Sequence, residues 1–230
     1  MSRSGSLFTG LFACFALSFG VAVVTPHNQV GALTPSFKEE DGVISDIYPN
    51  AMGGNAANGR NVYISEGCQA CHSQIVRGSE SADIDRGWGA RRTVARDYLF
   101  EEPPVFGASR LGPDLTNVGS EKWRNEPELD PVKPSKRDTA WQYLHLYHPT
   151  AVIKGSNMPS YGHLFVKRKV TGHPSSDALV LNGALAPEPG FELVPTAEAK
   201  ALVAYLSSLN RSSPLKEAGA VAAVAAPVKK

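Results

Sequence analysis

The residues best suited to chemistry lie in one short string, Cys68-Gln69-Ala70-Cys71-His72. Two cysteines separated by two residues and followed at once by a histidine form the attachment signature of haem c. The spacing suits that chemistry, because two thiols can add across the two vinyl groups of one porphyrin. The adjacent His72 is then held under the iron as its proximal ligand. The string occurs once, which predicts one covalently bound haem c.

A pair of cysteines at this spacing also occurs in redox-active disulfides and in zinc sites. A redox pair belongs beside a βαβ pattern, which this sequence lacks. A four-ligand zinc site needs a second pair of ligands at metal spacing. Outside the string, Cys14 is the remaining cysteine, and it lies in an apolar run where a small apolar role is simpler. Haem attachment is therefore the favoured interpretation.

The sixth iron ligand is predicted from the methionines. Met158 lies in the Pro- and Gly-punctuated string KGSNMPSY, whereas a methionine that only fills core belongs more often on a helix face. Met52, in a Gly/Asn-rich loop before the motif, is the weaker candidate. A Met/His pair raises the reduction potential and leaves no open coordination position, so we expect neither catalysis nor a small-molecule substrate at this iron. The rival ligands are four histidines, each more simply a surface or hydrogen-bonded side chain: His145, His148, His163 and His173.

The string RLGPDL, residues 110–115, is expected to support the proximal ligand. A ligand histidine normally donates its other ring N–H to a fixed acceptor, and the Gly-Pro turn places the Pro113 carbonyl as a candidate acceptor for His72. An ordinary turn is the alternative. Arginines are candidates to pair with the haem propionates, although charged loop residues are usually just solvated. Arg110 ranks first because it adjoins the turn, followed by Arg77, Arg91 and Arg92.

The elements that must position these residues begin with an uncharged stretch from Leu7 to Val24. Its length approaches the roughly 17–25 residues of a membrane-spanning helix. A cleaved signal peptide is the alternative, but its apolar core is usually only about 7–15 residues long, and the nearest small-residue site, Val30-Gly31-Ala32, lies well past this stretch. We therefore expect residues 1–25 to be a retained anchor. Arg3 places the N-terminus in the cytoplasm and the body of the protein on the outer face of the membrane.

Residues 26–50 carry several prolines and glycines with little periodicity, which indicates an extended linker. Residues 51–211 form the predicted haem c domain. Residues 212–230 are a low-complexity tail, whose Ala/Val-rich part beyond Pro214 is expected to be disordered. The near balance of 23 basic and 22 acidic residues gives no reason to expect a nucleic-acid partner.

Three helices are predicted within the haem c domain. One begins after Asn55 as N-cap and leads into the motif. A second covers residues 139–147, with Asp138 as N-cap and His148-Pro149 as its end. The third covers residues 196–209, with Thr196 as N-cap. No convincing strand pattern is visible, so the domain is expected to be mainly α with long loops.

The longer string GRNVYISEGCQACHSQIVR, residues 59–77, resembles the mono-haem subunit (subunit II) of cbb3-type cytochrome c oxidases. The strings FGASRLGPDL, SNMPSY and LVAYL continue the resemblance in the same order, up to about Leu209. The resemblance implies a class I cytochrome c fold on the periplasmic side of the bacterial inner membrane, tethered by one transmembrane helix. It also implies His72 and Met158 as axial ligands.

The resemblance further implies a place in an electron-transfer chain. Electrons would come from a di-haem cytochrome c subunit or another donor cytochrome and pass to the haem–copper catalytic subunit, where O2 is reduced. A free-standing, membrane-anchored electron shuttle is the alternative. The segment between His72 and Met158 is longer than one haem requires, and long loops are usually functional, which favours subunit docking and the oxidase.

The sequence departs from the family pattern in three places. Residues 80–96 differ after the motif, residues 123–139 form an insertion, and Tyr161-Gly162-His163 replaces a Pro-rich end of the Met158 loop. These departures concern contacts with neighbouring subunits and leave the predicted ligands in place.

Overall fold

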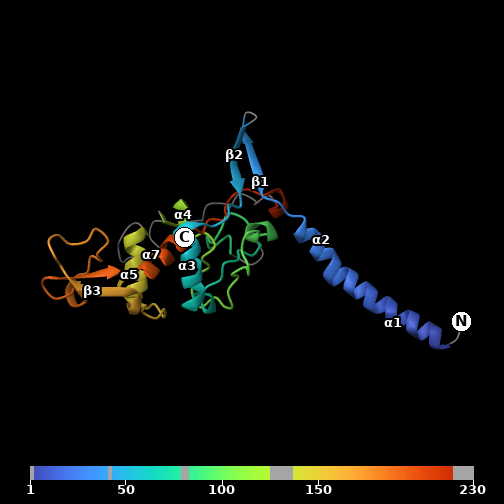
Figure 1. The fold of residues 1–230 in the computed structure, drawn as a ribbon, viewed down its shortest axis with the longest axis horizontal. Coiled ribbons are helices and arrows are strands. Elements are labelled where there is room, and N and C mark those ends of the chain that lie inside the picture. The colour runs from blue at the N-terminus through green and yellow to red at the C-terminus, as the bar shows by residue number, and fades with distance from the viewer. Residues whose placement is uncertain (1–2, 41–42, 79–82, 125–136, 220–230) are drawn as a thin grey trace, which may run out of the picture. The chain divides into compact units, whose positions relative to one another are not determined.

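The structure is a computed structural model that describes residues 3–40, 43–78, 83–124 and 137–219. Its contacts divide the chain into two compact units. The first comprises residues 1–50 and 94–101, and the second comprises residues 51–93 and 102–230. The described residues combine helices and long loops with four short strands, which form two antiparallel pairs (Figure 1).

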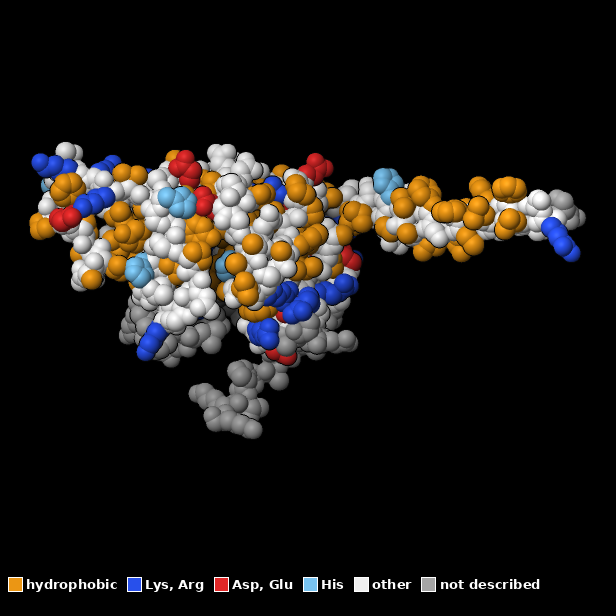
Figure 2. Space-filling view, turned by 90° about the horizontal axis from the view of Figure 1, so that it is seen from below, with side chains coloured by type: hydrophobic (Ala, Val, Ile, Leu, Met, Phe, Trp, Pro, Cys, Tyr) orange, Lys and Arg blue, Asp and Glu red, His pale blue; other side chains and the backbone are white. Residues whose placement is uncertain are grey.

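The first unit begins with one continuous helix. It consists of α1 (Arg3–Phe19), a wider π-helical turn (Gly20–Val24) and α2 (Thr25–Gly31). None of its residues is buried, and Figure 2 shows hydrophobic side chains along it. At a rise of 1.5 Å per residue it is about 44 Å long, more than the roughly 30 Å hydrocarbon core of a bilayer. In length and composition the helix is consistent with a membrane anchor.

The helix passes the predicted boundary at residue 25 and ends at Gly31. Pro26 marked the expected end, because proline has no N–H to donate within a helix. The π-helical turn just before it accommodates this loss: the N–H and the hydroxyl of Thr25 both bond to the carbonyl of Gly20, five residues back. The helix is therefore longer than the uncharged stretch, Leu7 to Val24, from which the anchor was predicted.

The predicted linker, residues 26–50, contains an antiparallel hairpin, which the sequence did not predict. Strand β1 (Ser36–Glu40) pairs with β2 (Val43–Tyr48), from Ser36 opposite Tyr48 to Glu40 opposite Val43. The register shifts between Lys38 and Glu39, and this irregularity breaks the two-residue alternation by which strands are recognised.

A second segment of the chain completes the first unit. The short 3₁₀ helix Ala95–Tyr98 lies beside the hairpin, where the Tyr48 hydroxyl donates to Asp97 Oδ1 at 2.5 Å. Arg96 donates to the carbonyl of Thr34. These contacts join two segments that lie far apart in the sequence.

The second unit is built on two helices that cross closely, α3 (Gly54–Ser65) and α7 (Ala197–Ser208). A Cβ atom on Gly59 would lie 1.8 Å from the carbonyl oxygen of Ala201, so only glycine permits this approach. The rings of Tyr63 and Tyr205, both fully buried, pack 5.3 Å apart beside the crossing.

The three predicted helices are present, with one difference at an N-terminus. Gly53 caps α3 without a side-chain hydrogen bond, so Asn55 is not the N-cap that the sequence predicted. For α7 the prediction is confirmed, because Thr196 accepts a hydrogen bond from the N–H of Ala199. In α5 (Thr139–Tyr147), Asp138 likewise accepts from the N–H of Trp141.

Shorter elements complete the second unit. Helix α4 (Glu121–Arg124) and helix α6 (Pro149–Val152) flank α5. Strand β3 (Phe165–Lys169) pairs antiparallel with β4 (Phe191–Pro195), which corrects the expectation of a domain without strands. Four residues of β3 are exposed, so it lacks the alternating apolar face of a recognisable strand.

The C-terminal segment from residue 212 was predicted to be a low-complexity tail, disordered beyond Pro214. Its described part, up to Gly219, is instead packed on the second unit and contains the 3₁₀ helix Lys216–Ala218. Leu215 is buried, and Arg91 donates to the carbonyl of Ser213 at 2.6 Å. Residues 220–230 of the predicted tail, like residues 125–136 of the insertion, lie outside the described part of the chain.

Candidate haem-attachment site

The motif lies at the C-terminal end of α3, where the chain leaves the helix. Gly67 adopts a left-handed backbone with φ of 70°, which ends the helix, and a 3₁₀ turn (Cys68–Ala70) follows. The N–H of His72 then bonds to the carbonyl of Cys68 at 3.0 Å. A rigid helix and a tight turn therefore hold the two cysteines and the histidine in one compact arrangement.

Neither motif cysteine is in a disulfide. Cys68 is buried, and Cys71 is half-buried. Burial and, to a smaller extent, the nearby Glu66 carboxylate raise the pKa of the Cys68 thiol to about 11, although the Tyr161 hydroxyl works in the opposite direction. Both sulfurs are thus free for chemistry with another group.

The ring of His72 is held from two sides. Its Nδ1 lies 2.8 Å from the carbonyl oxygen of Pro113, the contact that the sequence predicted. A Cβ atom on Gly112 would come within 2.3 Å of His72 Cε1, so glycine leaves the space that the ring occupies. Burial lowers the pKa of His72, and the Pro113 hydrogen bond opposes that shift. In the neutral ring, Nδ1–H donates to the carbonyl and Nε2 keeps its lone pair.

Backbone pairing fastens the motif to a second segment, residues 106–115. Its hydrogen bonds, all between 2.7 and 3.0 Å, are Ala108 N–H to Gln69, Gly112 N–H to Cys71, Leu115 N–H to Ser73 and Gln74 N–H to Phe106. Gly107 has φ of 86°, and a Cβ there would meet the carbonyl oxygen of His72 at 2.2 Å. The two segments therefore follow one another closely, which explains why Pro113 reaches His72.

Asp114 is the buried polar centre of this pairing. One carboxylate oxygen accepts from the Ser73 hydroxyl at 2.6 Å and from the Ile75 N–H at 2.9 Å. The other accepts from the Thr116 N–H at 2.9 Å. A single side chain thus satisfies three donors on both segments.

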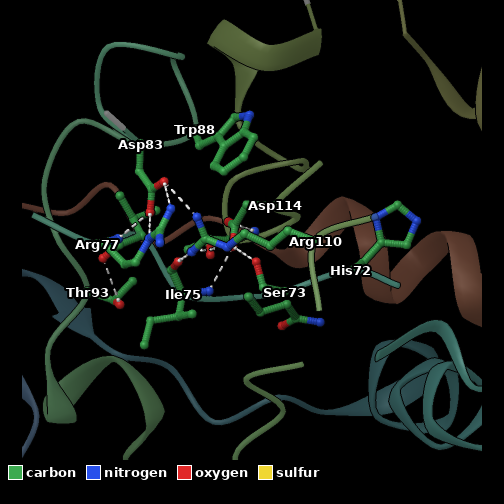
Figure 3. A network of polar contacts seen from close by, with 12 residues as sticks. His72, Ser73, Ile75, Arg77, Asp83, Trp88, Thr93, Arg110 and Asp114 are labelled. Atoms are coloured by element: carbon green, nitrogen blue, oxygen red, sulfur yellow. Dashed lines mark hydrogen bonds and ion pairs between the residues drawn. The ribbon is translucent and has the colours of Figure 1, made fainter. Parts of the chain in front are cut away.

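A second carboxylate, Asp83, extends the network away from the motif (Figure 3). It accepts from Arg110 at 2.6 Å, and from the backbone N–H and the guanidinium of Arg77 at 2.7–3.0 Å. Burial alone would raise the pKa of Asp83, but the hydrogen bonds from Arg77 and Arg110 outweigh it and lower the pKa. Arg110 also donates to the carbonyl of Ile75 at 2.6 Å and lies 5.0 Å from the ring centre of Trp88.

The four arginines proposed for propionate binding all have partners within the protein. Arg110 and Arg77 hold Asp83. Arg91 bonds to the carbonyls of Ser213 and Arg92, and Arg92 bonds to the carbonyl of Glu217. These contacts give Arg110 a structural role, and its pairing with a haem propionate stays a prediction that they do not support.

The two methionine candidates lie at the edge of one core. Met158 and Met52 are both half-buried and pack against the hydrophobic cluster that contains Cys68. The N–H of Met158 donates to Ser156 Oγ at 3.2 Å. The structure therefore brings both methionines to the core beside the motif and does not rank one above the other.

The rival histidines have other surroundings. His145 stacks on Trp141 with ring centres 4.7 Å apart, and His148 Nδ1 lies 2.9 Å from Thr150 Oγ1. His163 pairs with a carboxylate, and His173 is exposed. His148, His163 and His173 therefore have the surface or hydrogen-bonded setting that was the simpler interpretation, whereas half-buried His145 packs against an aromatic ring.

Sequence reasoning missed the two carboxylates that organise the site. Asp114 carried a usable signal, since an aspartate that accepts the N–H two residues later is a common local turn motif. Asp83 carried none, because its partner Arg110 lies 27 residues away in the sequence.

Comparison with protein families decides the classification. The family described as cytochrome C oxidase, mono-heme subunit/FixO, matches residues 15–187. The chain belongs to the FixO family. The match covers most of the chain, including the motif, Asp114 and Met158. Membership indicates a subunit of a cytochrome c oxidase with a role in electron transfer, and it implies one haem and a catalytic partner subunit. Among curated proteins, no sequence matches the chain.

The residues present fit the haem that FixO membership implies. Two thiols outside any disulfide lie next to a histidine whose Nδ1 is engaged by a carbonyl. That engagement leaves Nε2 as the ring nitrogen with a free lone pair. These residues therefore fit one haem, and the protein already orients the His72 ring.

Proposed function

We propose that this chain is the electron-transfer subunit of a membrane haem–copper terminal oxidase, holding one covalently bound haem c. Cys68 and Cys71 attach the haem, and His72 and Met158 are its axial ligands. When bound, haem iron alternates between two oxidation states and carries one electron at a time. The observation that carries the proposal is the contact between His72 Nδ1 and the Pro113 carbonyl at 2.8 Å, directly beside two free thiols.

The protein contributes orientation and shielding to this function. The Pro113 carbonyl holds His72 in the tautomer whose Nε2 can bind iron, and Asp114 fixes the segment that carries the carbonyl. The crossing of α3 and α7, with the motif at the end of α3, supports a class I cytochrome c fold.

The outer face of the motif leaves room for a partner subunit. An open hollow of about 470 Å³ adjoins it, lined by Gly67, Gln69, Ala70, Pro104, Phe106, Gly107 and Ala108. Gln69 and Ala70 are the two residues between the cysteines, so another subunit can approach the haem edge there. We infer a di-haem cytochrome c subunit or another donor cytochrome on the input side, and the haem–copper catalytic subunit on the output side.

The orientation in the membrane follows from the anchor. We infer that the helix Arg3–Gly31 is retained as an anchor and is not cleaved. The N-terminus then lies in the cytoplasm, and the haem domain lies on the periplasmic side of the bacterial inner membrane. Thiol attachment of haem and an outward-facing domain agree with one another, because both belong to an exported electron carrier.

Purification in a mild detergent tests the oxidase assignment. The chain is expected to co-purify with a large haem–copper subunit and to keep its haem stain in a denaturing gel, which reports covalent attachment. Cys68→Ala with Cys71→Ala is expected to abolish the stain. If the chain with its haem purifies alone, it is a free-standing, membrane-anchored shuttle and the oxidase proposal fails.

The sixth ligand has its own test. Met158→Ala is expected to leave the covalent haem in place but to abolish the sulfur-to-iron absorption band near the red end of the spectrum. Met52→Ala is the matched control, since Met52 is also half-buried against the same core, and it should keep the band. The opposite pattern would assign the ligand to Met52.

A further inference from the structure

A hydrogen-bonded histidine–carboxylate pair joins the two segments that carry the proposed haem ligands. His163 Nε2 lies 2.9 Å from Glu66 Oε2. Glu66 is the C-cap of α3, two residues before Cys68, whereas His163 follows Met158 by five residues. The contact therefore bridges 97 residues of sequence and connects the motif directly to the Met158 loop.

Tyr161 makes a second connection between the same segments. It is half-buried against the core cluster that contains Cys68, and its hydroxyl is near enough to the Cys68 thiol for each group to influence the pKa of the other. Its ring centre lies 6.0 Å from that of His163. A thioether sulfur remains a weak hydrogen-bond acceptor, so this contact is still available after Cys68 has been attached to haem.

The backbone around these side chains is itself fixed. The N–H of Tyr161 bonds to the carbonyl of Leu146 at 2.9 Å, and the N–H of Leu164 bonds to the carbonyl of Tyr161 at 3.0 Å. The chain on both sides of His163 is thus anchored to helix α5 and to its own turn. From this fixed base the His163 side chain extends to Glu66.

We propose that Glu66 and His163, supported by Tyr161, are positioning residues that hold the Met158 loop closed over the motif. The inference rests on the proposed function, in which Met158 is the sixth iron ligand. His163 has a side chain 60% exposed and Glu66 one 22% exposed, so the pair is of the surface type. Such a pair adds little to global stability, but it shifts the opening equilibrium of a loop by up to about fivefold.

Displacement of the methionine measures that opening. The full-length chain, loaded with haem and kept in detergent, is titrated with imidazole while the sulfur-to-iron band is followed. His163→Ala and Glu66→Gln are each expected to raise the apparent affinity for imidazole by about two- to fivefold. Far-UV circular dichroism should show the same thermal unfolding as the wild type, because the core is untouched.

The control removes an exposed ion pair elsewhere in the second unit. Lys167→Ala breaks the pair with Glu188, which joins β3 to the chain just before β4. It should leave the imidazole affinity unchanged. The double variant Glu66→Gln/His163→Ala should match either single variant, since the two residues act through one contact. A reversed pair, Glu66→Lys with His163→Glu, should restore the wild-type affinity.

Three results would overturn the inference, and they separate it from the proposed function. Equal imidazole affinity in the wild type and His163→Ala would show that the Glu66–His163 pair does not hold the loop closed. Met158 would still be the proposed ligand. Additive effects in the double variant would show that the two side chains act separately. A wild type that has no band, or that keeps its band in Met158→Ala, would overturn both the clamp and the ligand assignment.

Discussion

The two sides of the candidate haem site are built by different means. On the His72 side, backbone hydrogen bonds between two segments and one buried carboxylate fix the ring and its acceptor. On the Met158 side, side-chain contacts are prominent: Ser156 Oγ accepts from the Met158 N–H, and the half-exposed pair Glu66–His163 closes the loop. This difference predicts that the distal side opens more readily than the proximal side.

The largest effect is expected from Asp114→Ala, which attacks the proximal side. The change leaves three donors without their acceptor, those of Ser73, Ile75 and Thr116. Because each unsatisfied buried donor costs about 1–3 kcal/mol, the free energy of unfolding should fall by roughly 3 kcal/mol or more. Urea titration followed by circular dichroism measures it.

The control for this change is Asp177→Ala. Asp177 is also a carboxylate that accepts several hydrogen bonds, from Ser175 and Lys200, but it is partly exposed. Its loss should cost less than about 1 kcal/mol. If the two variants were equally unstable, the proximal segment would not be the rigid part of the site.

Gly112→Ala is the next largest change and acts directly on the ligand. The new Cβ would lie 2.3 Å from His72 Cε1 and 2.7 Å from Nδ1, so the ring or the turn must move. Overpacking of this kind costs about 1–3 kcal/mol, and the ring should lose its hydrogen bond to Pro113. Haem content per chain, measured after alkaline pyridine treatment, is expected to fall. Gly78→Ala, where a Cβ meets nothing within 4 Å, should keep the wild-type haem content.

Features that depend on nearby residues could be predicted from the sequence. Helices α5 and α7 were predictable because Asp138 and Thr196 cap them locally. The contact of His72 with Pro113 followed from the chemistry of a ligand histidine. The hairpins were missed because β1 has an irregular register and β3 is largely exposed.

Partners of the charged residues could not be predicted, because they depend on how distant loops meet. Arg110 was predicted to pair with a propionate for its closeness to the Gly-Pro turn, and its bond to Asp83, 27 residues earlier, was not foreseen. Likewise His163 was one of four rival iron ligands, and its carboxylate partner lies 97 residues earlier. Local patterns indicate the ligands and the helices, whereas tertiary contacts decide which charges meet.

A smaller effect on stability is expected from replacing Asp83, and this effect depends on pH. Its folded-state pKa is lowered by Arg77 and Arg110, so its stabilisation is fully present above the unfolded value of about 3.9 and is lost as the pH falls below it. Asp83→Asn should therefore destabilise the protein by about 1–2 kcal/mol at pH 7. The difference from the wild type should shrink as the pH is lowered through 4 to 2. A difference that stays constant over this range would show that charge is not what Asp83 contributes.

The smallest effect on global stability is expected from Ser156→Ala, the distal counterpart of Asp114→Ala. Ser156 Oγ accepts a single hydrogen bond, from the N–H of Met158 at 3.2 Å, and both residues are half-buried, so water can replace it. The free energy of unfolding should fall by less than about 1 kcal/mol. The sulfur-to-iron band, however, should be lost at a lower temperature than in the wild type, while the haem remains attached. If the band and the fold instead melted together as in the wild type, the Met158 loop would be as firmly built as the His72 side, and the contrast between the two sides would not hold.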